Sequence, residues 1–513
     1  MMTVTQFKRE DRLAAIFALG LATVLGGMAI RRYSSWHAGY FDLGIYFNHL
    51  SAIAGGHWDR AFSGHFHPIL LPLALPFTIL PADMAARVLL ALQAVALALP
   101  IPALRRAFGW SAAIAYALHF AVWYNGLFEY HPDHLAIPLA VWFLLAVRAG
   151  RFGEALVPAL LTALIKEPFA LQTAACGIYL LTLRQWRLGF LLVAAGSAYF
   201  MGAWAVLSAS QWAWHAADPS VLAPNLSIPA YAAAYSRLGN SPGQMLFSLI
   251  FHPLDWIGDI LRERPKILYL AFLFGSFGFL PLLRPRPLLL AVPPLALSLL
   301  SSNPHYYHWE YHYTAGVVGP LAVAFGEGLD LLRRLRLRIS PTLLGATVAA
   351  GALIAHVVLA PSPLGQVFRR SDMWTFNATA YGRGEHEDRL DRLIEEFVPD
   401  NPDIAVSSQS MVTGSRLFRR TYLIPFPAGV FEPYRRPVFD HGRWRSDTVM
   451  ADIVVLDLKR PWSSDDQVCQ WKVTTCEDGE VSKWFLLTQE RLRTEMDVLC
   501  DQDGIMIFQR RRS

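Results

Sequence analysis

The chain has 513 residues, of which 54% are hydrophobic and 17% are charged, and its formal net charge is +5. Soluble domains carry roughly 25% charged residues, so this composition excludes an ordinary soluble protein. The positive side chains collect in short clusters between apolar runs, which is typical of membrane topology and not of nucleic-acid binding.

Apolar runs approach 20 residues again and again along the chain, and at about 1.5 Å per residue a helix of that length crosses the hydrocarbon core. The first follows Lys8, Arg9 and Arg12 and lacks a small-residue cleavage site, so we expect a retained helix. The pattern predicts a polytopic α-helical membrane protein with about eleven transmembrane helices. They are expected near residues 13–30, 84–104, 109–127, 134–148, 153–166, 168–183, 188–208, 266–283, 288–302, 314–332 and 342–360.

Arginine clusters follow every even-numbered segment. They are Arg105-Arg106, Arg148 with Arg151, Arg184 with Arg187, Arg284 with Arg286, and Arg333 to Arg338. Because positive loops stay in the cytoplasm, we expect the N-terminus inside. An odd number of crossings then places the C-terminal region outside.

The first outer loop, residues 31–83, is expected to hold helices that lie along the membrane surface. Asp42 lies in it, about ten residues after the first apolar segment, and His65 and His67 follow. As a general base, Asp42 would take a proton from an acceptor hydroxyl. The structural alternative is a helix N-cap.

A second polar cluster precedes the fourth segment and contains Glu129, His131 and Asp133. These side chains could position an acceptor or bind a divalent cation, Mg or Mn. For Asp133 the alternative is a structural role at a helix N-terminus.

A third cluster, Lys166-Glu167, falls at the expected outer turn between the fifth and sixth segments. The lysine could hold a lipid phosphate as a point charge, and Glu167 could hold the lysine or act on the acceptor. A mutual ion pair without a ligand is the alternative.

The fourth cluster is the aromatic stretch 303–313, with His305, His308, Glu310 and His312. Histidines spaced by three and four residues would share one helical face, as a metal site or as a polar rim that binds sugars. We expect all four clusters to face one outer cavity.

The composition changes after Ala360, where Pro361-Ser362-Pro363 marks a boundary. We therefore expect a transmembrane domain over 1–360 and a small α/β domain on the outer side over 361–513. Residues 385–397 have the apolar spacing of a helix. Strands are expected at Ile404–Val406, Tyr422–Ile424, Asp452–Leu458 and Gly504–Phe508. Outside the cytoplasm Cys469 and Cys476 could form a disulfide, and free thiols are the alternative.

Several stretches in this order resemble the bacterial membrane family named domain of unknown function 2079. They are Phe41–Ile45, His65–Leu70, His131–Pro138, Lys166-Glu167, Tyr311–Tyr313, Ile404–Ser410 and Asp452–Asp457. That family looks like a branch of the GT-C glycosyltransferases, which use polyprenyl-phosphate sugars and carry an essential Asp or Glu in the first outer loop. The resemblance implies that role for Asp42. This chain has no Asp-X-Asp pair in its early outer loops, so metal dependence stays open.

These observations favour an inverting glycosyltransferase of a bacterial inner membrane, with a polyprenyl-phosphate-linked sugar donor and a glycan or lipid acceptor. No Walker loop, Rossmann fingerprint or nucleophile elbow is present, which argues against a nucleotide-driven pump. A glycolipid or ion transporter, or flippase, is the main alternative, since buried acids and histidines also form proton relays. A non-catalytic scaffold is a third.

Overall fold

The computed structural model describes residues 4–62, 64–217, 230–335, 340–370, 376–401, 403–409, 412, 417, 422–440, 443–459 and 480–511. Packing divides the chain into two compact units, which are described separately. Unit 1 comprises Met1–Ala29, Ala61–Pro72 and Leu90–Ala378, and unit 2 comprises Ile30–Arg60, Leu73–Leu89 and Thr379–Ser513. The predicted domains were a transmembrane domain over 1–360 and an outer domain over 361–513, and this division stays a prediction.

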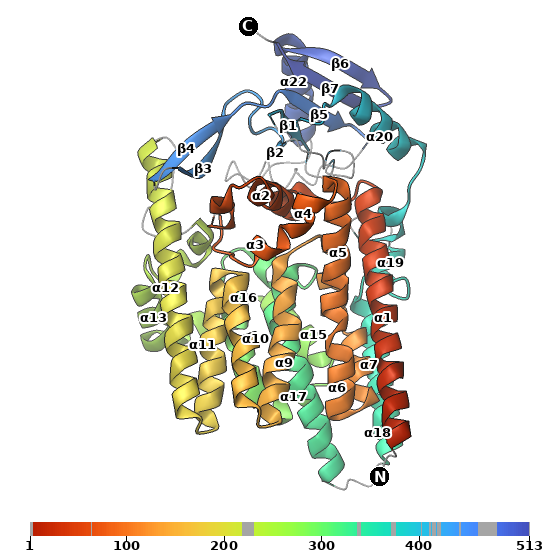
Figure 1. The fold of residues 1–513 in the computed structure, drawn as a ribbon, viewed down its shortest axis with the longest axis vertical. Helices are drawn as coiled ribbons and strands as arrows, with labels where there is room; N and C mark the ends of the chain where they lie inside the picture. Colours follow the sequence, from red (N-terminus) through yellow and green to blue (C-terminus); the bar gives the residue numbers. More distant parts are fainter. Residues whose placement is uncertain are drawn as a thin grey trace. The chain divides into compact units, whose positions relative to one another are not determined.

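Most of unit 1 is helical (Figure 1), and α1 and α5 are divided between the units. Its helices include α1 (Val4–Ser34), α5 (Ala82–Ala98), α6 (Pro100–Phe108), α7 (Trp110–Leu118), α8 (Phe120–Leu127), α9 (Ala136–Arg148), α10 (Phe152–Ile165), α11 (Glu167–Thr182), α12 (Trp186–Ala217), α15 (Arg264–Gly275), α16 (Val292–Leu300), α17 (Ala315–Arg334) and α18 (Pro341–Leu359). Further helices are α3 (Leu70–Leu73), α13 (Pro242–Phe251), α14 (Pro253–Arg262) and α19 (Gln366–Arg369).

Each of the eleven predicted apolar segments overlaps one helix or two helices in succession. The segment at 84–104 is divided before Pro100, the first residue of α6, where a missing N–H costs nothing. The segment at 266–283 was predicted too long, because α15 ends at Gly275 and the chain turns through positive φ at Gly278 and Phe279.

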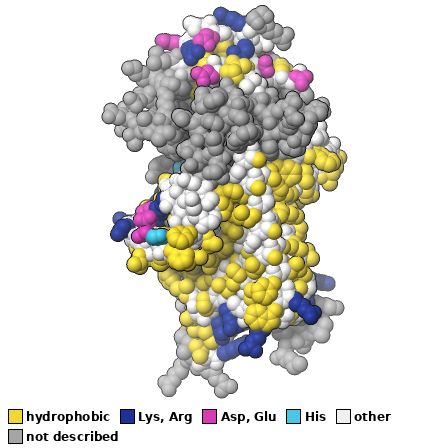
Figure 2. Space-filling view, turned by 90° about the vertical axis from the view of Figure 1, so that its left-hand side faces the viewer, with side chains coloured by type: hydrophobic (Ala, Val, Ile, Leu, Met, Phe, Trp, Pro, Cys, Tyr) yellow, Lys and Arg dark blue, Asp and Glu magenta, His cyan; other side chains and the backbone are white. Residues whose placement is uncertain are grey.

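Among the described residues, four helices are long and apolar enough to cross a membrane by length and composition. They are Arg9–Ser34, Ala82–Phe108, Trp186–Ala209 and His312–Arg334. Figure 2 shows a broad hydrophobic surface with Lys and Arg gathered near one end of it. Exposed apolar side chains such as Phe190, Leu191 and Phe247 suit contact with lipid and not with water. The number of crossings and their orientation stay predictions.

The first outer loop contains helices, as expected, and their position on a membrane surface stays a prediction. Its part in unit 2 holds a single π-helical turn (Tyr40–Gly44), then α2 (Ile45–Ala54) and α4 (Leu75–Ile79).

The rest of unit 2 contains a five-stranded sheet in the order β2-β1-β5-β7-β6. Strands β1 (Ala405–Ser408), β2 (Tyr422–Pro425) and β5 (Ile453–Asp457) pair in parallel, and β7 (Ile505–Arg510) runs antiparallel to β5 and β6 (Met496–Gln502). A separate hairpin joins β3 (Tyr434–Asp440) and β4 (Arg443–Val449), and the helices are α20 (Glu385–Phe397) and α22 (Glu480–Glu495).

The predicted helix at 385–397 and all four predicted strands are confirmed. Every residue of β5 is buried, as expected for a continuous apolar strand covered on both faces. Strands β3, β4 and β6 and helix α22 were not predicted. Cys469 and Cys476 lie outside the described residues, whereas Cys176 and Cys500 are buried free thiols.

Candidate functional site

Asp133 is the centre of a buried polar cluster in unit 1. One carboxylate oxygen lies 2.8 Å from Nδ1 of His131 and 3.4 Å from Nζ of Lys166, and the other lies 3.7 Å from Nε2 of His312. All four side chains are less than a tenth exposed. The second, third and fourth predicted clusters therefore meet around one carboxylate.

The local backbone explains why Asp133 and Lys166 reach this point. Asp133 lies in a 3-10 turn, Pro132–Leu135, that leads into α9. Lys166 is an extended residue between α10 and α11, and Pro168 lies in the first turn of α11, where proline is tolerated. Asp133 lies at the start of that helical segment, as the structural alternative expected, and it also contacts side chains that are distant in the sequence.

A second pair lies beside the cluster. The Nδ1 atom of His65 is 2.6 Å from Oε1 of Glu167, and the backbone N–H of Phe66 donates to Oε2 of the same carboxylate at 2.8 Å. Glu167 is fully buried. Among the described residues no ion pair joins Lys166 to Glu167, so the alternative of a mutual pair was wrong: each has a different partner.

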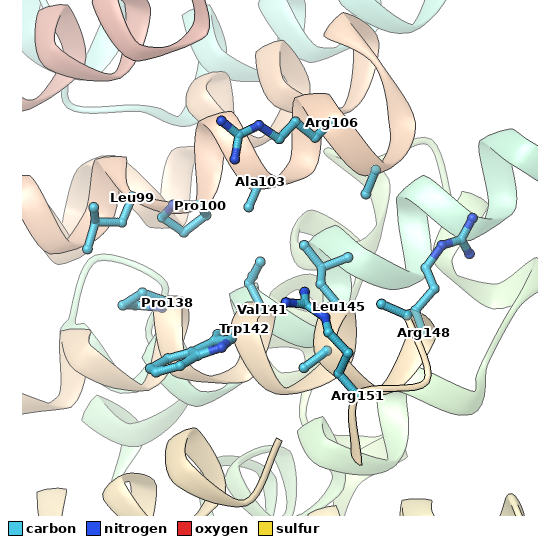
Figure 3. Close-up of a pocket in the computed structure, with 13 residues that line it drawn as sticks. Leu99, Pro100, Ala103, Arg106, Pro138, Val141, Trp142, Leu145, Arg148 and Arg151 are labelled. Atoms are coloured by element: carbon cyan, nitrogen blue, oxygen red, sulfur yellow. The ribbon is translucent and has the colours of Figure 1, made fainter. Parts of the chain in front are cut away.

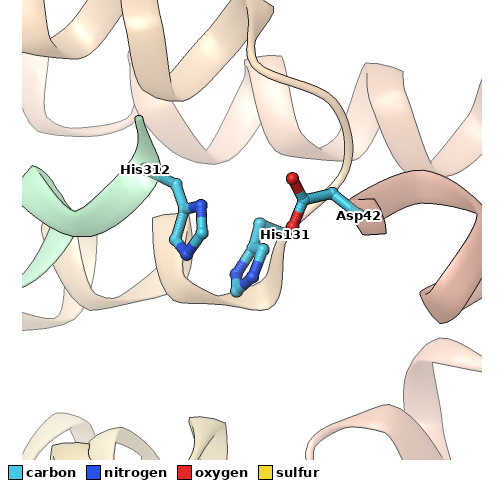
Figure 4. Close-up of side chains that lie close together, drawn as sticks. All are labelled: Asp42, His131 and His312. Carbon is cyan, nitrogen blue, oxygen red and sulfur yellow. The ribbon is translucent and has the colours of Figure 1, made fainter. Parts of the chain in front are cut away.

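The rings of His131 and His312 stack face to face, with centroids 3.5 Å apart and an angle of 17° between the ring planes (Figure 4). Burial lowers the pKa of His131 to about 4, although the Asp133 carboxylate works in the opposite direction. His131 is therefore neutral near pH 7. Burial would raise the pKa of Asp133, but the neighbouring His131 and Lys166 outweigh it and hold that pKa well below its usual range.

Gln93, which the sequence analysis did not single out, positions His131. Its amide Nε2 donates to the carbonyl oxygens of Asn125 and Glu129, at 3.0 and 2.9 Å, and its Oε1 accepts the N–H of His131 at 3.1 Å. Gln93 is fully buried in α5. A lone glutamine in a membrane-length apolar segment was the signal that could have identified it.

The aromatic stretch 303–313 does not form one helix, so the prediction that His305, His308 and His312 share a helical face was wrong. Two short 3-10 turns, Pro304–Tyr307 and His312–Thr314, are separated by a bend. A 3-10 turn has three residues per turn and rarely extends, so the helical spacing does not apply.

The histidine and aromatic rings of this stretch stack on one another and do not line one face of a helix. His305 stacks on Tyr311 with centroids 5.1 Å apart, Tyr306 stacks on Tyr313 at 4.4 Å, and His308 packs on Trp309. Partial burial raises the pKa of Glu310 to about 7, so its carboxyl titrates near neutral pH. Burial also lowers the pKa of His308.

The remaining predicted residues fall into two groups. His67 and Glu129 are buried in unit 1, and the His67 ring centroid lies 6.3 Å from that of His65. Asp42 lies in unit 2, half-buried in the π-helical turn before α2. The residue before α2 is Gly44, so Asp42 is not its N-cap. The convergence of Asp42 with the unit 1 cluster stays a prediction.

The cluster offers ligand atoms for a cation and one ammonium donor for an anion. Carboxylate and neutral imidazole are ligands that divalent metals use, and Asp133, His131 and His312 supply both types. The ammonium of Lys166, however, already lies beside the same carboxylate oxygen that faces His131. A cation at that oxygen would meet the ammonium, whereas a phosphate would find a donor in Lys166 and would have to displace the Asp133 carboxylate from it.

Comparison with known proteins gives three findings. The family model described as predicted membrane protein (DUF2079) matches residues 32–386. No curated protein matches the chain. One similar solved structure is the crystal structure of ArnT from Cupriavidus metallidurans bound to undecaprenyl phosphate. It is 13% identical, with 96% of this chain and 97% of that chain covered and a TM-score of 0.43. A likeness of that degree carries no argument about chemistry.

Proposed function

The chain belongs to the DUF2079 family of predicted membrane proteins, and from that premise we propose that it is a membrane glycosyltransferase. It transfers a sugar from a polyprenyl-phosphate donor to an extracytoplasmic glycan or lipid acceptor, in a bacterial inner membrane. The observation that carries this proposal is the buried cluster of Lys166, Asp133, His131 and His312 in unit 1.

A buried ion pair is weak evidence for stability, because removing two charges from water costs about as much as their attraction returns. Ionisable groups in an apolar helical protein are expensive and are usually retained for function. Lys166 pairs with Asp133 at 3.4 Å, which is long for a charge-assisted hydrogen bond. The ammonium can therefore exchange this partner for the phosphate of a donor lipid.

In the proposed reaction, the bond between the anomeric carbon and the phosphate oxygen breaks, and the acceptor oxygen forms a new bond to the same carbon with inversion. The polyprenyl phosphate leaves with the electron pair, and Lys166 stabilises its negative charge. Asp42 takes the proton of the acceptor hydroxyl as general base. The stacked rings of the 303–313 stretch offer flat surfaces to the sugars, and Glu129, His131 and Glu310 orient their hydroxyls.

In this reaction the lysine supplies positive charge at the leaving phosphate, and the participation of Mg or Mn stays an untested prediction. If Mg or Mn does take part, its ligands would have to include groups other than the Asp133 oxygen beside Lys166. The outer α/β domain is proposed to bind the acceptor.

The main alternative, a glycolipid or ion transporter, draws on the same buried cluster, because carboxylates and imidazoles also relay protons. Transport would need the cluster to open to both sides in turn. A flux assay in vesicles separates the two: a transporter moves substrate without forming a glycosidic bond.

The decisive experiment is Asp42→Asn in an assay with a polyprenyl-phosphate sugar. Loss of a general base costs roughly 10²–10⁴-fold in rate, so transfer should fall by that factor while the thermal unfolding temperature is unchanged. Asp59→Asn, which alters another aspartate of the same loop, is the matched control and should keep its rate. Near-normal transfer by the Asp42 variant would reject the proposed role.

A further inference from the structure

A groove lies in unit 1 between α6 and α9, and no residue of the candidate site lines it. Its volume is about 590 Å³. The side chains that line it are mostly apolar or small, with three arginines and no acidic residue: Leu99, Pro100, Ala103, Arg106, Ala107, Pro138, Val141, Trp142, Leu145, Ala146, Arg148, Ala149 and Arg151. Apolar walls with a basic rim suit a ligand that has one apolar and one anionic part.

Apolar side chains gather towards one end of the groove, and two of the three arginines lie towards the other, with Arg106 above Ala103 (Figure 3). Figure 3 shows Leu99, Pro100 and Pro138 towards one end and Arg148 and Arg151 towards the other. Leu99 is 60% exposed and Trp142 is 41% exposed, so the apolar part opens to the surroundings of the helices. In a membrane those surroundings are lipid chains.

The length of the groove fits one leaflet. From Leu99 to Arg106 α6 advances seven residues, and from Pro138 to Arg148 α9 advances ten. At about 1.5 Å per residue these steps cover about 10–15 Å, roughly half of the ~30 Å hydrocarbon core. An acyl chain could therefore lie along the groove with its head group at the arginines.

The arginines can accept an anion. Arg106 contacts Asp11 at 3.0 Å, Arg148 contacts Asp330 at 2.8 Å and Arg151 contacts Glu154 at 2.7 Å. These acids do not line the groove. The side chains of Arg106 and Arg151 are more than half exposed, and exposed pairs contribute little, about 0–1 kcal/mol. Arg148 also contacts Glu327 at 3.5 Å. A guanidinium has five N–H donors, so one or two acidic contacts leave capacity for phosphate oxygens.

We propose that this groove binds a membrane phospholipid with an anionic head group, its phosphate held by Arg106, Arg148 and Arg151 and one acyl chain along α6 and α9. Basic pockets between transmembrane helices on the cytoplasmic side recognise such lipids. These arginines belong to the clusters that the positive-inside rule assigns to the cytoplasm, so the lipid is one of the inner leaflet. The inference does not depend on the proposed sugar transfer.

Native mass spectrometry of the full chain in mild detergent tests the proposal, with phosphatidylglycerol and phosphatidylcholine of identical acyl chains as probes. We expect tighter binding of phosphatidylglycerol to the wild type. About 1 kcal/mol per basic side chain corresponds to a roughly 10–30-fold weaker phosphatidylglycerol affinity in the double variant Arg106→Gln/Arg151→Gln. Arg187→Gln, an exposed arginine of α12 that does not line the groove, is the matched control and should bind as the wild type does.

A second variant tests the apolar part. Ala103→Phe places a ring in the partly exposed wall of α6 and should reduce binding of both lipids while the arginines remain. Equal affinity of the wild type for the two lipids would overturn the proposal. So would phosphatidylglycerol binding that is unchanged in the double variant, or lost equally in the Arg187 control.

Discussion

At the scale of single residues, the cluster around Asp133 places four ionisable side chains in a buried site. The ammonium of Lys166 contacts the Asp133 carboxylate. The stacked rings of His131 and His312 contact the same carboxylate. Because an uncompensated charge in an apolar interior costs several kcal/mol, the buried charges of Lys166 and Asp133 stabilise each other. This dependence can be measured.

Asp133→Asn should destabilise the protein by about 3–5 kcal/mol, because it leaves the Lys166 ammonium buried without its carboxylate. Lys166→Met should cost less, since His131, 2.8 Å from Asp133, can take up a proton in its place. The double variant Lys166→Met/Asp133→Asn should lose clearly less stability than the sum of the single variants. Unfolding in a detergent titration measures all three free energies. Strictly additive losses would show that the two charges are not coupled.

At the scale of elements, α11 and α12 are held close together by glycines. A Cβ added to Gly196 would lie 2.5 Å from the carbonyl oxygen of Ala170, and one added to Gly177 would lie 2.6 Å from the backbone nitrogen of Val193. Both clashes are with backbone, which cannot move aside without separating the helices. Small residues that allow close helix approach are a common device in membrane helix packing.

Gly196→Ala should therefore destabilise the protein by roughly 1–3 kcal/mol, the usual cost of overpacking a tight contact. Gly202→Ala is the matched control, because a Cβ at that position of the same helix meets no atom within 4 Å. The control should be neutral or slightly stabilising, since alanine is the better helix former. Thermal unfolding in detergent gives both shifts, and equal shifts in the two variants would contradict the packing argument.

At the scale of the whole molecule, the arginine clusters predict that Arg187 lies in the cytoplasm and that residues after 360 lie outside. Glu385, an exposed residue at the start of α20, represents the outer region. In a background in which Cys469 and Cys476 are replaced by serine, Glu385→Cys should react with a membrane-impermeant thiol reagent in intact spheroplasts. Arg187→Cys should react only after permeabilisation. The opposite labelling would invert the predicted orientation and remove the candidate site from the outer face.

The sequence by itself determined the helical segments, the helix at 385–397 and four of the strands, because apolar length and periodicity are local properties of the chain. It also identified the four polar clusters, since ionisable residues beside apolar segments are conspicuous. Only the tertiary structure decided how they pair. Lys166 pairs with Asp133 and not with Glu167, and the ring of His131 stacks on that of His312. The side chain of Gln93 accepts the backbone N–H of His131. Those contacts join positions 33 to 181 residues apart, and local spacing contains no information on them. The 303–313 stretch shows the same limit, because packing against neighbouring rings overrode its helical spacing.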